Sequence, residues 1–74
     1  MSTSHMDMSG QILAALRRKA EAMTVGEVVD AVHRASGIRW HRSSVERALR
    51  RMVAGGMVDA VRQEAGSPRF EVTQ

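Results

Sequence analysis

The chain contains no cysteine, which excludes disulfide bonds, thiolate metal sites and a catalytic thiol. Its apolar runs are far too short to span a bilayer, and its polar N-terminus lacks the apolar core of a signal peptide. These absences fit a cytoplasmic protein with no membrane partner. The 74 residues leave room for one domain with a compact core.

Groupings of residues that support catalysis are also missing. The serines have no His/Asp partners at a recognisable spacing, the acids are scattered, and no glycine-rich loop could cradle a phosphate. His33 and His41 lack a convincing third metal ligand, so we interpret them as surface or hydrogen-bonded histidines. The sequence therefore predicts a non-enzyme with no cofactor and no metal.

The first six residues, Met1 to Met6, resemble a remnant of a cloning site, because a His-Met pair is what a common cloning site encodes. We expect residues 1–6 to be disordered and residues 7–74 to form the domain. On this interpretation the natural chain begins at Met6 or Met8.

Two segments in the first half have the apolar spacing of amphipathic helices. The first runs from about Ser9 to Ala22, with Ser9 as its N-cap. The second follows Thr24 and Glu27, which match a capping box, and Gly37 is suited to end it.

A third helix is predicted from about Ser43 to Ala54, with Ser43 or Arg42 at its cap. Gly55 and Gly56 end it. Its predicted buried stripe consists of Val45, Ala48, Leu49, Met52 and Val53.

The remaining segments predict strands. Ile38–His41 alternates apolar and polar residues, so we expect a short strand there with Ile38 and Trp40 turned inward. Met57–Arg62 and Arg69–Thr73 predict a β-hairpin around a Gly-Ser-Pro turn, with Phe70 and Trp40 in the core. The order helix, helix, short strand, helix, strand, strand indicates a winged helix-turn-helix, mainly α with a small antiparallel β-wing.

The run Ser43–Val58 (SSVERALRRMVAGGMV) resembles the recognition helix and wing entry of bacterial winged-helix regulators, including the multiple-antibiotic-resistance type. Ala31–Ser44 and Arg69–Val72 look more like the DNA-binding half of ferric-uptake-regulator proteins. The resemblance covers roughly Thr24 to Val72 and implies a DNA-binding domain. It does not extend to metal sensing, because the His- and Cys-rich dimerisation half of those regulators has no counterpart here.

In a helix-turn-helix the N-terminal portion of the third helix enters the major groove. Arg47 and Arg50 are therefore candidates for guanine edges, which a guanidinium can contact bidentately. Glu46 can pair with Arg50 at i, i+4 spacing or accept from a cytosine amine. The other candidate DNA-binding residues, on phosphates or at the wing, are Arg39, Arg42, Ser43, Ser44, Arg51, Arg62 and Arg69.

The placement of the arginines matters more than their number. Ten of the eleven basic residues are arginines, which fits a GC-rich coding bias, and the net charge is only +3. Residues 39–51, however, contain five arginines and one acid. We therefore predict sequence-specific binding to double-stranded DNA, in transcriptional regulation on the nucleoid. The alternative is a winged helix that binds a protein partner, and the chain could also form a homodimer or belong to a larger parent protein.

Overall fold

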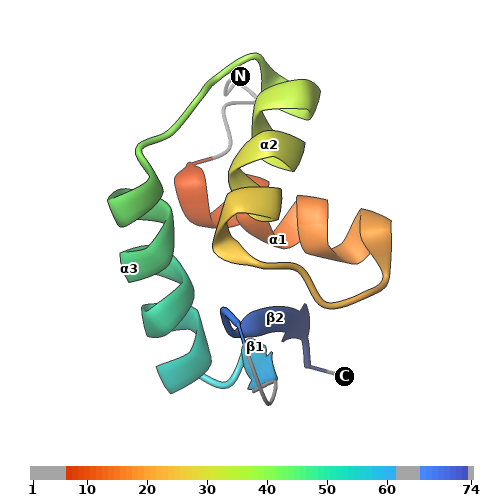
Figure 1. The fold of residues 1–74 in the computed structure, drawn as a ribbon, viewed down its shortest axis with the longest axis vertical. Helices are drawn as coiled ribbons and strands as arrows, with labels where there is room; N and C mark the ends of the chain where they lie inside the picture. Colours follow the sequence, from red (N-terminus) through yellow and green to blue (C-terminus); the bar gives the residue numbers. More distant parts are fainter. Residues whose placement is uncertain (1–6, 62–65, 74) are drawn as a thin grey trace, which may run out of the picture.

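The computed structural model describes residues 7–61 and 66–73, and it has three helices and a two-stranded antiparallel sheet (Figure 1). The predicted fold class, a mainly helical winged helix-turn-helix, is confirmed. The expected cloning remnant at residues 1–6 and the wing residue Arg62 lie outside the described residues. The elements are α1 (Met8–Lys19), α2 (Val25–Ser36), α3 (Arg42–Ala54), β1 (Val58–Val61) and β2 (Arg69–Val72).

Helix α1 begins two residues earlier than the sequence suggested. Asp7 has extended backbone geometry, and its carboxylate accepts a hydrogen bond from the Gly10 N–H at 2.9 Å. The predicted N-cap Ser9 is therefore wrong, because an aspartate two residues upstream caps the helix instead. The helix ends at Ala20, which adopts a left-handed conformation (φ 60°) and donates its N–H to Leu16 O at 3.1 Å.

Helix α2 begins and ends as predicted. Thr24 Oγ1 accepts from the Glu27 N–H at 3.2 Å, and Glu27 Oε1 accepts from the Thr24 N–H at 3.0 Å, which completes the capping box. Gly37 ends the helix with a φ of 80°, a conformation that glycine adopts without steric cost. Valine is a mediocre helix former, so this valine-rich helix depends on the burial of its side chains.

One core connects the helices to the sheet. The three helices pack on one another, α1 contacts β2, and α3 contacts β1. Burial of these apolar side chains is the main favourable contribution to folding. The buried residues are Ile12, Ala15, Leu16, Met23, Val25, Val28, Val29, Val32, Val45, Ala48, Leu49, Met52, Val58 and Phe70.

The predicted strand at Ile38–His41 is wrong. This segment is an extended connection in which the Ile38 side chain is 43% exposed. The Ile38 N–H donates to Ser36 Oγ at 3.1 Å, so a side chain occupies a donor that a strand would have needed. Trp40 is half-buried and packs against the core as predicted, and its Nε1–H donates to Gln11 Oε1 at 2.9 Å.

Met23, between α1 and α2, pairs with the sheet in place of the Ile38–His41 segment, which was expected to form the third strand. Met23 and Phe70 exchange two backbone hydrogen bonds, of 2.9 and 2.8 Å, and form an antiparallel bridge at the edge of the sheet. The hairpin itself pairs β1 with β2 in the register Val58↔Val72 and Ala60↔Phe70. The wing is therefore joined to the helices by backbone pairing as well as by the buried Phe70 side chain. Among the described helices, none has the length and apolar character needed to cross a membrane.

Candidate nucleic-acid interface

Helix α3 has a strictly divided surface. Val45, Ala48, Leu49 and Met52 are buried against the core, as predicted, and Val53 is half-buried. Figure 1 shows α3 at one side of the α1–α2 pair, so the side turned from the core faces outward. We call this side the outer face of α3, and it consists of Arg42, Ser43, Ser44, Glu46, Arg47, Arg50 and Arg51.

The outer face of α3 contains one internal ion pair. Arg50 Nη2 lies 3.0 Å from Glu46 Oε2, so the predicted i, i+4 pair is confirmed. The side chain of Arg50 is nevertheless 75% exposed, and such a surface pair contributes little to stability. Ser43, Glu46, Arg47 and Arg50 line a shallow hollow on this face. Within residues 7–61 and 66–73, Arg47 has no ion pair, and its guanidinium is available to a ligand.

The N-terminus of α3 is open. The cap residue is His41, not Ser43 or Arg42 as predicted, and among the described residues its side chain makes no capping hydrogen bond. The first helical bond runs from the Val45 N–H to His41 O at 3.0 Å. The amides of the first turn therefore have no partner within the helix, and together with the helix dipole they favour an anion.

Arg42 lies beside the start of α2. A Cβ built on Gly26 would lie 3.5 Å from Arg42 Nη1, an ordinary van der Waals distance. The sequence contains no signal for this proximity of α2 and α3. The proximity of Arg42 to Gly26 places the Arg42 guanidinium where α2 and α3, the two helices of the helix-turn-helix, meet.

Arg39 binds back to α2. Its Nη1 lies 3.5 Å from Asp30 Oδ1, and its Nη2 lies 3.4 Å from His33 Nδ1. Both partners of the ion pair are more than half exposed. Arg39 therefore links the connection between α2 and α3 back to α2 by exposed contacts that contribute little to stability, and its predicted DNA contact stays a prediction.

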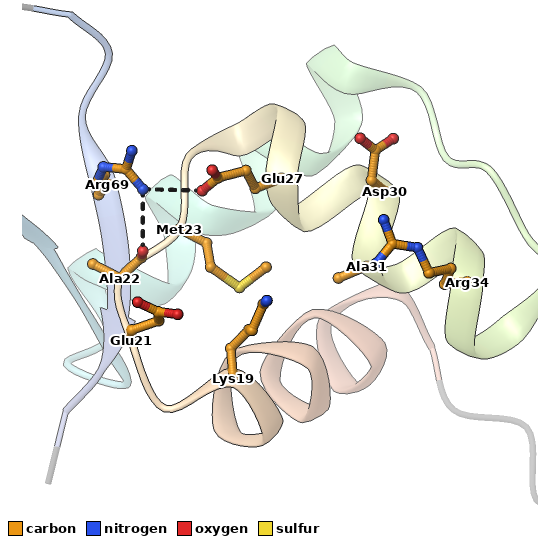
Figure 2. Close-up of a pocket in the computed structure, with 9 residues that line it drawn as sticks. All are labelled: Lys19, Glu21, Ala22, Met23, Glu27, Asp30, Ala31, Arg34 and Arg69. Atoms are coloured by element: carbon orange, nitrogen blue, oxygen red, sulfur yellow. Dashed lines mark hydrogen bonds and ion pairs between the residues drawn. The ribbon is translucent and has the colours of Figure 1, made fainter.

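Arg69 of the wing is held by α2 and by the segment before it. Its Nη1 lies 3.0 Å from Glu27 Oε1 and donates to Ala22 O at 3.3 Å, as Figure 2 shows. Only 35% of its side chain is exposed. The sequence predicted that Arg69, near the wing tip, could reach DNA. In the structure its guanidinium instead binds Glu27 and the Ala22 carbonyl within the protein.

Glu27 consequently has two functions, as capping-box acceptor and as partner of Arg69. The hydrogen bond from the Thr24 N–H is the main cause that lowers the pKa of Glu27 below its usual value. Partial desolvation acts in the opposite direction, and the charge of Arg69 lowers the pKa further. The Thr24 hydrogen bond and the charge of Arg69 therefore both favour the ionised form of Glu27, the form that pairs with Arg69.

The exposed sides of the two wing strands are acidic. Asp59 and Glu71 are directly opposed in the register and both are exposed. In the described part of the wing the only arginine is Arg69, which is already bound. Within the described residues, no group of three His, Cys, Asp or Glu side chains could hold a metal ion.

Comparison with known proteins supports the fold. No protein-family model matches the chain, and no curated protein matches it. A solved structure of the ferric uptake regulator from Francisella tularensis with iron superimposes with a TM-score of 0.78 at 15% identity, covering 100% of this chain and 56% of that one. A structure described as that of prokaryotic transcription factors gives a TM-score of 0.73 at 19% identity, covering 86% of this chain and 50% of that one. The chain thus shares its fold with these transcription-factor structures and spans about half of their length.

Proposed function

We propose that this domain binds double-stranded DNA sequence-specifically, as a transcriptional regulator or its DNA-binding part, with α3 in the major groove. The observation that carries the proposal is the outer face of α3, where four exposed arginines accompany one acid, opposite a fully buried stripe. The fold shared with solved transcription-factor structures supports it. The proposed function is DNA binding, which requires no catalytic residue.

Within this proposal, different residues of the outer face of α3 contact bases and phosphates. Arg47 contacts a base edge, because its guanidinium has no partner in the described part of the chain. Glu46 holds Arg50 through their ion pair. Arg42 and Ser43 contact phosphates together with the open amides of the first turn. Ser44 adjoins these contacts, and Arg51 offers a further phosphate contact from the last turn of the helix.

The described part of the wing contributes less to DNA binding than the winged-helix fold alone would suggest. Phosphates would be repelled by the exposed carboxylates of Asp59 and Glu71. Arg69 positions the wing through Glu27 and does not supply a free charge. A wing contact with the DNA backbone or minor groove therefore depends on Arg62, which lies beyond the described end of β1.

The proposal is tested by selecting bound sequences from a random duplex pool and titrating the selected duplex over a series of salt concentrations. Affinity should fall steeply with salt, because phosphate contacts release counterions. Arg47→Ala should weaken specific binding by about 1–3 kcal/mol, or about 10–100-fold. Arg17→Ala is the matched control, since Arg17 is an exposed arginine at the end of α1.

Binding that is absent, or insensitive to salt, contradicts the proposal and favours the protein-binding alternative. The symmetry of the selected sequence adds a second result. A palindrome with half-sites about one helical turn apart indicates a dimer on DNA, whereas a single asymmetric site indicates a monomer.

A further inference from the structure

A second candidate surface lies between α1 and the C-terminal half of α2. Here a groove, which we call the α1–α2 groove, has an apolar floor and wall of small side chains. Ala15 and Val32 are buried, Ala14 and Ala31 are half-buried, and Ala35 is exposed. No residue of α3 lines this groove within the described part of the chain. In Figure 1 the C-terminal end of α1 and helix α3 lie on opposite sides of the molecule.

The rim of the α1–α2 groove is basic. Arg18, Lys19 and Arg34 line it, and among the described residues no carboxylate does. None of the three forms an ion pair within residues 7–61 and 66–73. None of the three is therefore held in a salt bridge by the described residues, although the charge of Lys19 acts on Glu27 in the adjoining hollow.

The adjoining hollow of Figure 2 shows where this basic rim ends. The two hollows share Lys19, Ala31 and Arg34, and only the one in Figure 2 also contains the acids Glu21, Glu27 and Asp30. Figure 2 shows Lys19 extending from the end of α1 toward α2, into the hollow that Ala31 and Arg34 also line. Lys19 and Arg34 thus lie at the border between a hollow lined by both acids and bases and an apolar groove whose charged lining residues are all basic.

We propose that the α1–α2 groove docks an amphipathic acidic helix of a partner protein. Alanine side chains allow the backbone of a docked helix to approach closely, since interhelical distance depends on the side chains at the contact. The apolar stripe of the partner lies on the alanines, and its flanking Asp or Glu residues meet Arg18, Lys19 and Arg34. A DNA phosphate complements the rim but not the floor, because it would leave the methyl groups without an apolar partner.

This inference goes beyond DNA binding and does not depend on it. Because α3 does not line the α1–α2 groove in the described residues, both surfaces can be occupied together. The domain would then link a DNA site to a second protein.

The test uses a synthetic capped helix of about 20 residues, long enough to form a stable helix in water. It carries Ala and Leu along one face and Glu on both flanks, and a control peptide has Lys in place of Glu. Titration into the isotope-labelled protein, followed by NMR, should shift the amides of Ala14, Ala31 and Ala35 with the Glu peptide only. Arg34→Glu should weaken binding about tenfold, because it places like charges together. Arg17→Glu is the matched control, since Arg17 does not line the groove although it is also on α1.

Four results would overturn the proposal: equal binding of the Lys peptide, shifts confined to α3, equal losses in Arg34→Glu and Arg17→Glu, or no shift at all. Two further results would assign the groove to another occupant. Shifts of the same alanine amides by duplex DNA would point to phosphates. A dimer in sedimentation equilibrium that Arg34→Glu dissociates would point to a second copy of the chain. Absence of DNA binding would leave the peptide result unaffected.

Discussion

The outer face of α3 and the wing strand β2 both carry arginines, and the protein uses them differently. Arg47 on α3 has no ion pair among the described residues, and Arg50 is 75% exposed beside Glu46. Arg69 on β2 is 35% exposed and is bound to Glu27 and to the Ala22 carbonyl. Arg47 can bind a phosphate or a base without giving up an ion pair within the described residues, and Arg50 remains largely exposed while paired with Glu46, whereas Arg69 attaches the wing to α2.

The difference shows that the partners of an arginine within the protein, more than its presence in the sequence, indicate whether it can bind DNA. A guanidinium that already has a carboxylate and a carbonyl would have to give up both to reach DNA. Its more direct effect is on the position of the hairpin relative to the helices. The predictions below separate these two functions, stability and binding, in order of decreasing effect.

The largest effect is expected from the inward side of α3. Leu49 is fully buried, so Leu49→Ala should lower the free energy of unfolding by about 2–5 kcal/mol. Urea unfolding followed by circular dichroism measures this. Arg47→Ala, two residues earlier on the outer face of α3, should change stability by less than about 0.5 kcal/mol. Similar losses in both variants would contradict the division of the helix into a core side and a binding side.

A smaller loss of stability is expected from the attachment of the wing. Arg69→Met and Glu27→Gln should each lower the melting temperature, and the double variant should lower it no further than Arg69→Met alone, which also loses the bond to Ala22 O. Glu27→Gln is informative because a glutamine at this position can still accept from the Thr24 N–H in a capping box. Additive losses would show that Arg69 does not act through Glu27.

The same pair should make stability depend on pH. The pKa of Glu27 is lowered in the folded state, so its ionised form stabilises the protein above the usual pKa of a glutamate. This contribution should be lost as pH falls from that usual pKa through the lower pKa of the folded state. The difference in melting temperature between the unsubstituted protein and Glu27→Gln, measured over this range, should therefore shrink as pH falls. A constant difference would contradict the assignment.

The smallest effect is expected on the exposed side of the wing. Asp59 and Glu71 face each other across the strands, and like charges in that position are destabilising. Asp59→Thr should therefore stabilise the domain by about 0.2–1 kcal/mol. Glu71→Thr should act in the same direction, because either substitution removes one of the two facing charges. Lower melting temperatures in both variants would refute the repulsion.

Local signals explain what the sequence could predict. The Thr24–Glu27 capping box, the Gly37 end, the buried stripe of α3 and the Glu46–Arg50 pair each involve residues within one or two turns. Their geometry follows from helix periodicity alone. The same periodicity showed which arginines face outward.

The errors concern pairings between distant segments and choices between adjacent caps. The alternation at Ile38–His41 suited a strand, but the edge of the sheet pairs with Met23, which no local pattern marked. The Arg69–Glu27 pair joins residues 42 positions apart in the chain and has no signature in the sequence. At α1 the predicted cap was Ser9, but the cap is Asp7; aspartate and serine are about equally favoured at an N-cap, so residue type alone does not decide between the two positions.

The most direct test of the central claim compares Arg47→Ala with Arg69→Ala on the selected duplex at the same salt concentrations. If α3 reads DNA and Arg69 only positions the wing, Arg47→Ala should weaken binding by about 10–100-fold. Arg69→Ala should weaken it far less at a temperature where both variants are folded. An equal or greater loss in Arg69→Ala would contradict the account.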